Sequence, residues 1–313
     1  MKQENTSTNT LIKIFITLFF ISFNLDNIAY AQDFSVKLTA CNLALDKNEL
    51  STAASVADEI LKQDPNNRDG LLCKGRALGA KGNYVEALSA LEMAANQSQP
   101  GFEQIISYLL IGNLHKSNNK NAEAIASYTK SLQLSEADKN DKFKLISHNL
   151  IGEAHAQNND LNAALASYLA GYKLVKNDNE RADSYERLGT TYSMLGQHDL
   201  AIEHQLKGVN MQKKSGTLDQ YANASLALGK VYEKAKEYPN AEKTYTKFIQ
   251  FAKDNGGAYY EAKASYELAQ IKVLSGDATS AKAMMTDALK MAKNIGEGDL
   301  ANEIEASLKK LNN

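Results

Sequence analysis

Apolar and small residues recur along this chain at helical spacing, most clearly between Ser225 and Phe251. The stripe there is formed by Leu228, Tyr232, Ala241, Tyr245 and Phe248. Spacings of three and four place side chains on one face of an α-helix. Pro239 lies between the two parts of the stripe and suits the first turn of a second helix, because its missing N–H would have no partner there. The stretch therefore predicts a hairpin of two antiparallel helices.

The same pattern occurs seven times. If Gly229 is numbered position 8 of its hairpin, Ala241 is position 20, Tyr245 position 24 and Phe248 position 27. Position 8 then recurs at residues 41, 75, 112, 152, 189, 229 and 269, and it is glycine in all but Cys41 and Ala269. Small residues at positions 8 and 20 allow two helices to approach closely.

This pattern resembles the tetratricopeptide repeat, whose motif is a Leu-Gly pair, an aromatic residue three positions on, and small, aromatic and small residues on a second helix. The resemblance covers nearly all of the chain after residue 31. It implies an all-α fold, an α-solenoid in the form of a right-handed superhelix, with about seven hairpins over residues 32–298. Residues 299–313 read as a closing helix with one polar side, as the exposed end of a stack requires.

The repeats are longer than usual in the second half of the chain. Successive positions 8 are 34, 37, 40, 37, 40 and 40 residues apart. The longer form resembles repeats of some bacterial regulators and sensor-kinase input domains. We expect the extra residues in longer second helices and in polar linkers, at 135–141, 176–180, 214–220 and 254–257.

The first 31 residues have the pattern of a secretory signal peptide. Lys2 and Lys13 precede an apolar run over 14–23, and Ala29-Tyr30-Ala31 fits a cleavage site. The run is too short to span a bilayer core of ~30 Å. We expect cleavage after Ala31 and export to the periplasm or the medium; an uncleaved signal anchor is the alternative. No later run suggests an integral membrane segment in the mature chain.

Composition narrows the class of partner. The chain has 313 residues, three prolines, no tryptophan and a formal net charge of -2. The near-neutral charge gives no electrostatic reason to expect a nucleic acid as partner.

Cys41 and Cys73 are the only cysteines. Export would place them in an oxidising compartment, which favours a disulfide. Helix axes, however, pack ~8–10 Å apart, whereas bridged Cα atoms lie ~4.4–6.8 Å apart. We therefore predict two separate buried thiols, with a disulfide as the alternative.

No catalytic or metal-binding motif is present. His148 and His155 are seven residues apart with no cysteine or carboxylate completing a metal site. His115 and His155 occupy position 11, where other repeats have Leu78 or Tyr192, so they read as half-buried packing residues. We expect no enzymatic activity, no cofactor and no metal.

The candidate site follows from the resemblance. In this family the first helices line the concave side, and positions 2, 5, 9 and 12 tend to point into it. We expect a polar ladder that contacts a protein or peptide partner, formed by Asn42, Arg76, Asn113, Asn149, Glu153, Glu186, Thr190, Asn223, Lys230, Lys263 and Gln270. An ordinary solvated helix face is the alternative. Some family members bind a C-terminal carboxylate with Lys, Asn and Arg residues on three consecutive first helices. No three consecutive repeats of this sequence have those residues in that order.

The sequence thus predicts a non-catalytic scaffold or adaptor that binds a protein or peptide in a concave groove. A sensory or regulatory module acting on an envelope enzyme or a membrane histidine kinase is the alternative.

Overall fold

The structure, a computed structural model, describes residues 33–311. The expected signal peptide and its cleavage site lie outside this range. The described residues contain helices and turns and no strand, so the fold is all-α, as predicted.

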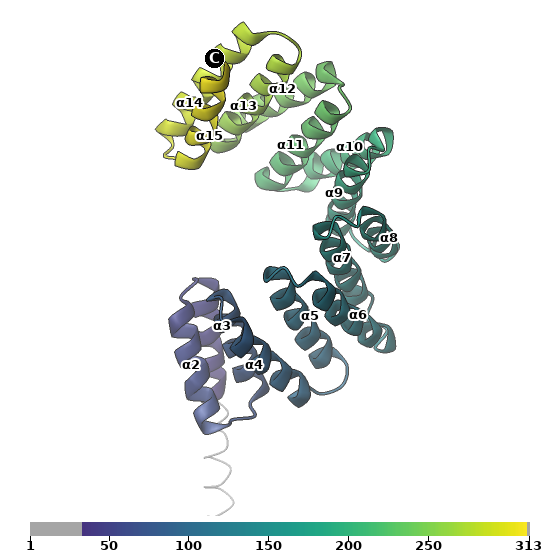
Figure 1. The fold of residues 1–313 in the computed structure, drawn as a ribbon, viewed down its shortest axis with the longest axis vertical. Coiled ribbons are helices and arrows are strands. Elements are labelled where there is room, and N and C mark those ends of the chain that lie inside the picture. The colour runs from purple at the N-terminus through teal and green to yellow at the C-terminus, as the bar shows by residue number, and fades with distance from the viewer. Residues whose placement is uncertain (1–32, 312–313) are drawn as a thin grey trace, which may run out of the picture. The chain divides into compact units, whose positions relative to one another are not determined.

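The helices form successive antiparallel hairpins (Figure 1). Residues 33–46 are helical and precede the second helix of the first hairpin, α2 (Leu50–Gln63). The remaining first helices are α3 (Arg68–Ala80), α5 (Phe102–Ser117), α7 (Asp141–Gln157), α9 (Asp178–Met194), α11 (Leu218–Lys234) and α13 (Ala258–Leu274). The remaining second helices are α4 (Tyr84–Gln97), α6 (Asn121–Ala137), α8 (Leu161–Tyr172), α10 (His198–Ser215), α12 (Tyr238–Asp254) and α14 (Ala278–Asn294). A last helix, α15 (Gly298–Leu311), packs on α14.

The repeat register predicted from the sequence is confirmed by burial. Positions 8, 20, 24 and 27 are buried in all seven hairpins. Glycine at position 8 leaves room for the side chain at position 24: a Cβ built at Gly75 would lie 2.6 Å from Leu91, and one at Gly189 would lie 2.7 Å from Gln205. Close approach of the two helices therefore depends on the missing side chain.

The turn inside each hairpin has one backbone feature in common. Position 15 has a positive φ in all seven hairpins, between 58° and 89°. This left-handed conformation ends the first helix and favours glycine or asparagine. Six of the seven residues are of these types, and Lys236 is the exception: Asn48, Gly82, Asn119, Asn159, Gly196, Lys236 and Gly276.

Most of the extra length of the later repeats lies in the helices. α2 and α4 have 14 residues each and α3 has 13, whereas α12, α13 and α14 have 17 each. Both helices of a hairpin are thus about one turn longer, and only residues 255–257 separate α12 from α13. The polar stretches taken as linkers are largely helical; Ser135 to Ala137, for example, belong to α6.

The prediction of two separate thiols is wrong. Cys41 and Cys73 form a disulfide whose Cα atoms are 6.4 Å apart. The argument from axis spacing failed because a Cα atom lies ~2.3 Å from its helix axis. Two Cα atoms that face each other across a helix contact are therefore much closer than the axes. The bond ties the helix at 33–46 to α3 and closes a loop with a sequence separation of 32.

Contacts divide the chain into two units, one ending at Phe143 and one beginning at Lys144. Unit 1 contains the hairpins up to α6. Unit 2 contains the helices from α8 to α15. The first helix of its first hairpin, α7, begins three residues before the boundary. In unit 2 a core of Ala262, Tyr266, Met285, Leu300 and Ile304 joins α13 and α14 to α15.

Candidate partner-binding surface

The first helices of unit 1 form an open surface with two neighbouring hollows. One, of about 520 Å³, lies between α3 and α5, and the other, of about 420 Å³, adds the helix at 33–46. Arg76 and Leu110 line both. Leu38, Leu72 and Ile106 give the second hollow apolar walls. We call this combined surface the α3–α5 groove.

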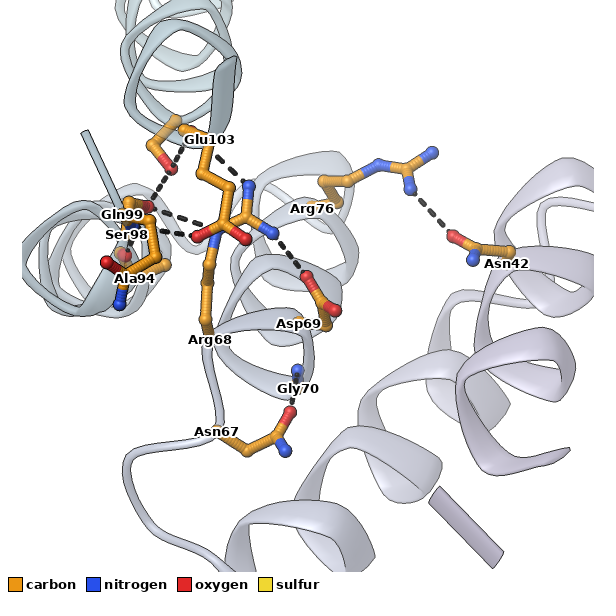
Figure 2. Close-up of polar contacts among 11 residues, drawn as sticks. Asn42, Asn67, Arg68, Asp69, Gly70, Arg76, Ala94, Ser98, Gln99 and Glu103 are labelled. Carbon is orange, nitrogen blue, oxygen red and sulfur yellow. Dashed lines mark hydrogen bonds and ion pairs between the residues drawn. The ribbon is translucent and has the colours of Figure 1, made fainter. Parts of the chain in front are cut away.

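Three predicted ladder residues meet in the α3–α5 groove. Arg76 lies on α3 and donates from Nη1 to Oδ1 of Asn42 at 3.0 Å (Figure 2). Asn113 on α5 accepts a hydrogen bond from the hydroxyl of Tyr128 at 2.7 Å. Asn42 and Asn113 are thereby oriented, and both are exposed.

Arg76 differs sharply from the other arginine of α3. The Arg68 side chain is only 17% exposed, bonds Ser98 and the Glu103 carbonyl, and pairs with Asp69 and Glu103 (Figure 2). Arg68 therefore fixes the start of α3 against the loop before α5. Arg76 is exposed, and the hydrogen bond to Asn42 occupies one of the five N–H donors of a guanidinium.

Three of the four charged ladder residues in unit 2, Glu153, Lys230 and Lys263, form ion pairs within the chain. Glu153 on α7 forms an ion pair with Arg187 on α9, which also bonds Asp183 at 2.9 Å. Burial lowers and these two carboxylates raise the pKa of Arg187, and the net change is upward. The guanidinium is therefore a fixed cation that holds α7 to α9.

A second network joins the first helices α11 and α13 to the closing helix α15. Glu267 on α13, whose side chain is 5% exposed, lies 3.2 Å from Lys230 of α11 and 3.6 Å from Lys263. Lys263 also contacts Glu303 of α15 at 2.9 Å. Lys230 and Lys263, predicted to face a partner, thus neutralise a buried carboxylate. Sequence reasoning placed Glu267 on no site.

Position 24 also contacts position 9 within one hairpin. The Tyr128 hydroxyl donates to Asn113, and Nε2 of Gln205 donates to Oγ1 of Thr190 at 3.2 Å. These bonds could have been predicted from the sequence, because hairpins with a tyrosine or glutamine at position 24 also have a polar residue at position 9.

The other ladder residues, Asn149, Glu186, Asn223 and Gln270, lie on α7, α9, α11 and α13 of unit 2. Within the described residues their side chains make no hydrogen bond or ion pair. Glu186 is half-buried, and burial, with Asp183 nearby, raises the pKa of its carboxyl.

Sequence models of the tetratricopeptide repeat match residues 38–101, 105–138 and 182–215. Those segments coincide with hairpins that keep the buried register and the left-handed turn described above. The chain belongs to the tetratricopeptide-repeat family. No curated protein matches the sequence.

Solved structures similar to this tetratricopeptide-repeat chain share its fold at low identity. The apo form of RapI has a TM-score of 0.64 at 12% identity, over 88% of this chain and 85% of RapI. A Signal Transduction ATPase with Numerous Domains from Pyrococcus horikoshii, which has a tetratricopeptide repeat sensor, has a TM-score of 0.65 at 13% identity, over 86% of this chain. The Cut9-Hcn1 assembly of APC/C has a TM-score of 0.56 at 16% identity, over 88% of this chain. This tetratricopeptide-repeat chain spans about half of the matched APC/C chain, 48%, and 43% of the ATPase.

Tetratricopeptide repeats are typically non-catalytic modules that bind proteins. Among the described residues no group of three His, Cys, Asp or Glu side chains is placed to hold a metal ion. Over the same range, no helix combines the length and apolar character that crossing a bilayer requires.

Proposed function

We propose that this chain is a protein-interaction scaffold that holds a segment of a partner protein in the α3–α5 groove of unit 1. One observation carries the proposal: two hollows with apolar walls meet at an exposed arginine with unused donors. Apolar side chains of the segment would occupy the hollows. Arg76 and Asn113 would hydrogen-bond its carbonyl or carboxylate oxygens, because groups of this kind orient a ligand in an apolar site.

The difference between the two units supports this choice. In unit 2 the ladder charges at Glu153, Lys230 and Lys263 already have partners within the chain. A partner protein would have to break those ion pairs, which costs free energy. In unit 1 binding at Arg76 requires no such loss.

Location forms part of the proposal. We propose that the chain is exported and cleaved after Ala31. The pattern of residues 1–31 supports this, and so does the Cys41–Cys73 disulfide, because such bonds persist in oxidising compartments. The class of the partner decides between a scaffold and a regulator: an envelope enzyme or membrane kinase bound in the groove would make the chain a regulatory module.

The test uses random peptides displayed on phage and selected on the purified chain. Recovered peptides are titrated against wild type, Arg76→Ala, Leu110→Ser and the control Lys62→Ala, an exposed lysine on α2. Losing a hydrogen bond to a charged group costs ~1.5–3 kcal/mol, so Arg76→Ala should weaken binding at least about tenfold. Lys62→Ala should leave the affinity unchanged. Peptides that bind Arg76→Ala and Leu110→Ser as tightly as wild type would overturn the proposal.

A further inference from the structure

A separate hollow of about 350 Å³ lies at the far end of unit 2. Two first helices and the closing helix end there, at Lys234 of α11, Leu274 of α13 and Leu311 of α15. Met285 of α14, which is almost fully buried, also lines it. We call this hollow the C-terminal pocket; it contains no residue of the α3–α5 groove.

The walls of the C-terminal pocket are apolar and open to solvent. Val273 and Leu274, adjacent on α13, are 37% and 49% exposed, and Leu311 faces them from α15. Large apolar side chains that gather around a hollow mark a binding site more often than scattered ones do. The wall is well suited to a straight aliphatic chain.

One carboxylate in the wall forms no direct ion pair. Glu233 of α11 is half-buried, and its carboxylate makes no hydrogen bond or ion pair within the described residues. Burial and then the nearby Glu267 raise the pKa of the Glu233 carboxyl, Lys230 and Lys234 lower it, and the net change is upward. Glu267 forms direct ion pairs with Lys230 and Lys263, whereas the Glu233 carboxylate forms none.

The backbone charges at the C-terminal pocket also favour a cation. The last carbonyl groups of an α-helix carry a partial negative charge, which favours cations. Three helices end at the C-terminal pocket, and their carbonyls add to the charge of Glu233. Lys310 of α15 is the one basic side chain among the lining residues, and it is exposed.

We infer that the C-terminal pocket is a second binding site, which takes a basic side chain of a partner protein. The aliphatic stem would lie on Val273, Leu274 and Met285, and the cation would reach Glu233 and the helix ends. Long basic side chains combine an apolar stem with a charged head in this way. The site is independent of the α3–α5 groove and goes beyond the proposed function.

The test uses three small probes of equal length: hexylammonium, hexanol and hexanoate. Each is titrated into the purified chain at pH 7.5 while methyl NMR signals of Val273, Leu274 and Met285 are followed. All three probes share the apolar chain, so differences in affinity report on the charge. Hexylammonium should bind more tightly than hexanoate by up to about fivefold, since a single partly exposed ion pair contributes up to ~1 kcal/mol.

Two variants assign the preference to its source. Glu233→Gln should reduce the difference between hexylammonium and hexanol to the part that the helix ends supply, whereas Lys310→Gln should increase it. The control is Glu261→Gln, in the first turn of α13 at the opposite end of that helix, which should behave as wild type. Circular dichroism establishes that each variant is folded.

Three results would overturn the inference. Equal affinity for all three probes would leave only an apolar hollow, and tighter binding of hexanoate would mean that Lys310 dominates. Methyl signals unmoved by tens of millimolar hexylammonium would mean that there is no site. None of these outcomes bears on the α3–α5 groove.

Discussion

Lys236 has a left-handed backbone conformation, and the six equivalent positions of the other hairpins are all glycine or asparagine. Its φ of 60° costs a residue with a Cβ roughly 1–2 kcal/mol. Glycine removes that cost but loses about 0.5–1 kcal/mol of chain entropy. We expect Lys236→Gly to raise the free energy of unfolding by about 0.5–1 kcal/mol in urea titrations. Lys234→Gly, two residues earlier in the last turn of α11, should lower it by a similar amount.

Gly229 illustrates a second effect of a single residue. A Cβ built there would overlap the ring of Tyr245, which is fully buried. We expect Gly229→Leu to cost ~1–3 kcal/mol or more, because neither helix of the hairpin can move without opening its core. Thermal melts measure the loss. Gly298→Ala, where an added Cβ meets nothing within 4 Å, is the control and should leave the midpoint within about 1 °C.

The first hairpin is joined to the first helix of the second hairpin by a covalent bond. Closing a loop of about 32 residues contributes roughly 3–4 kcal/mol in the chain-entropy description. We expect Cys41→Ala combined with Cys73→Ala to lower the stability of unit 1 by about that amount. Urea unfolding of wild type after full reduction should give the same loss, and reductant should not change the double variant. Two titratable thiols in unreduced, unfolded wild type would contradict the bond.

Pairs of first helices give the second prediction at this scale. A ladder carboxylate that faced only solvent or a partner would contribute little to stability. The structure pairs Glu153 with Arg187, and both side chains are less than one-third exposed, at 28% and 27%. We therefore expect Glu153→Gln to cost about 1–2 kcal/mol. Glu203→Gln breaks the exposed pair with Lys207 within α10 and should leave the free energy of unfolding nearly unchanged.

The elements show where sequence reasoning succeeded and where it stopped. Positions 8, 20, 24 and 27 were predicted because a hairpin needs small residues where its helices meet, and that need is local. The Arg187–Glu153 pair joins residues 34 apart, and nothing in the spacing of charges selects it from other pairs. The disulfide was missed because axis distances say little about the Cα atoms of two facing residues. The left-handed turn at position 15 was readable from its glycines and asparagines, and only Lys236 obscured it.

At the scale of the whole molecule, both units contain a histidine held neutral. Burial lowers the pKa of His115, whose Nδ1 lies 2.9 Å from the Tyr84 hydroxyl, below its ordinary value of 6.5. Burial, and then Lys207, lower the pKa of His204, which stacks on Tyr192. A lowered histidine pKa means that the unfolded chain binds more protons than the folded one below pH 6.5. Stability is therefore complete above pH 6.5 and is lost as the pH falls through the lowered values.

Melting temperatures measured between pH 7.5 and about 5, above the range where most carboxylates titrate, test this expectation. Wild type should melt at progressively lower temperature below pH 6.5. His115→Gln combined with His204→Gln should show a smaller change over the same range, whatever its stability at pH 7.5. An equal slope in both proteins would mean that other groups cause the loss.

The Cys41–Cys73 bond also bears on the order in which the chain takes shape. Both cysteines lie within the first 73 residues, so the bond can close before any later hairpin has been made. A repeat hairpin cannot bury its apolar face alone and needs a neighbour to stack on. The bond holds the first hairpin against α3, the first helix of the second hairpin, and so provides that neighbour from the outset. Assembly of the repeats then has a preferred direction, from the amino terminus onward, and an oxidant present during refolding should speed the refolding of unit 1.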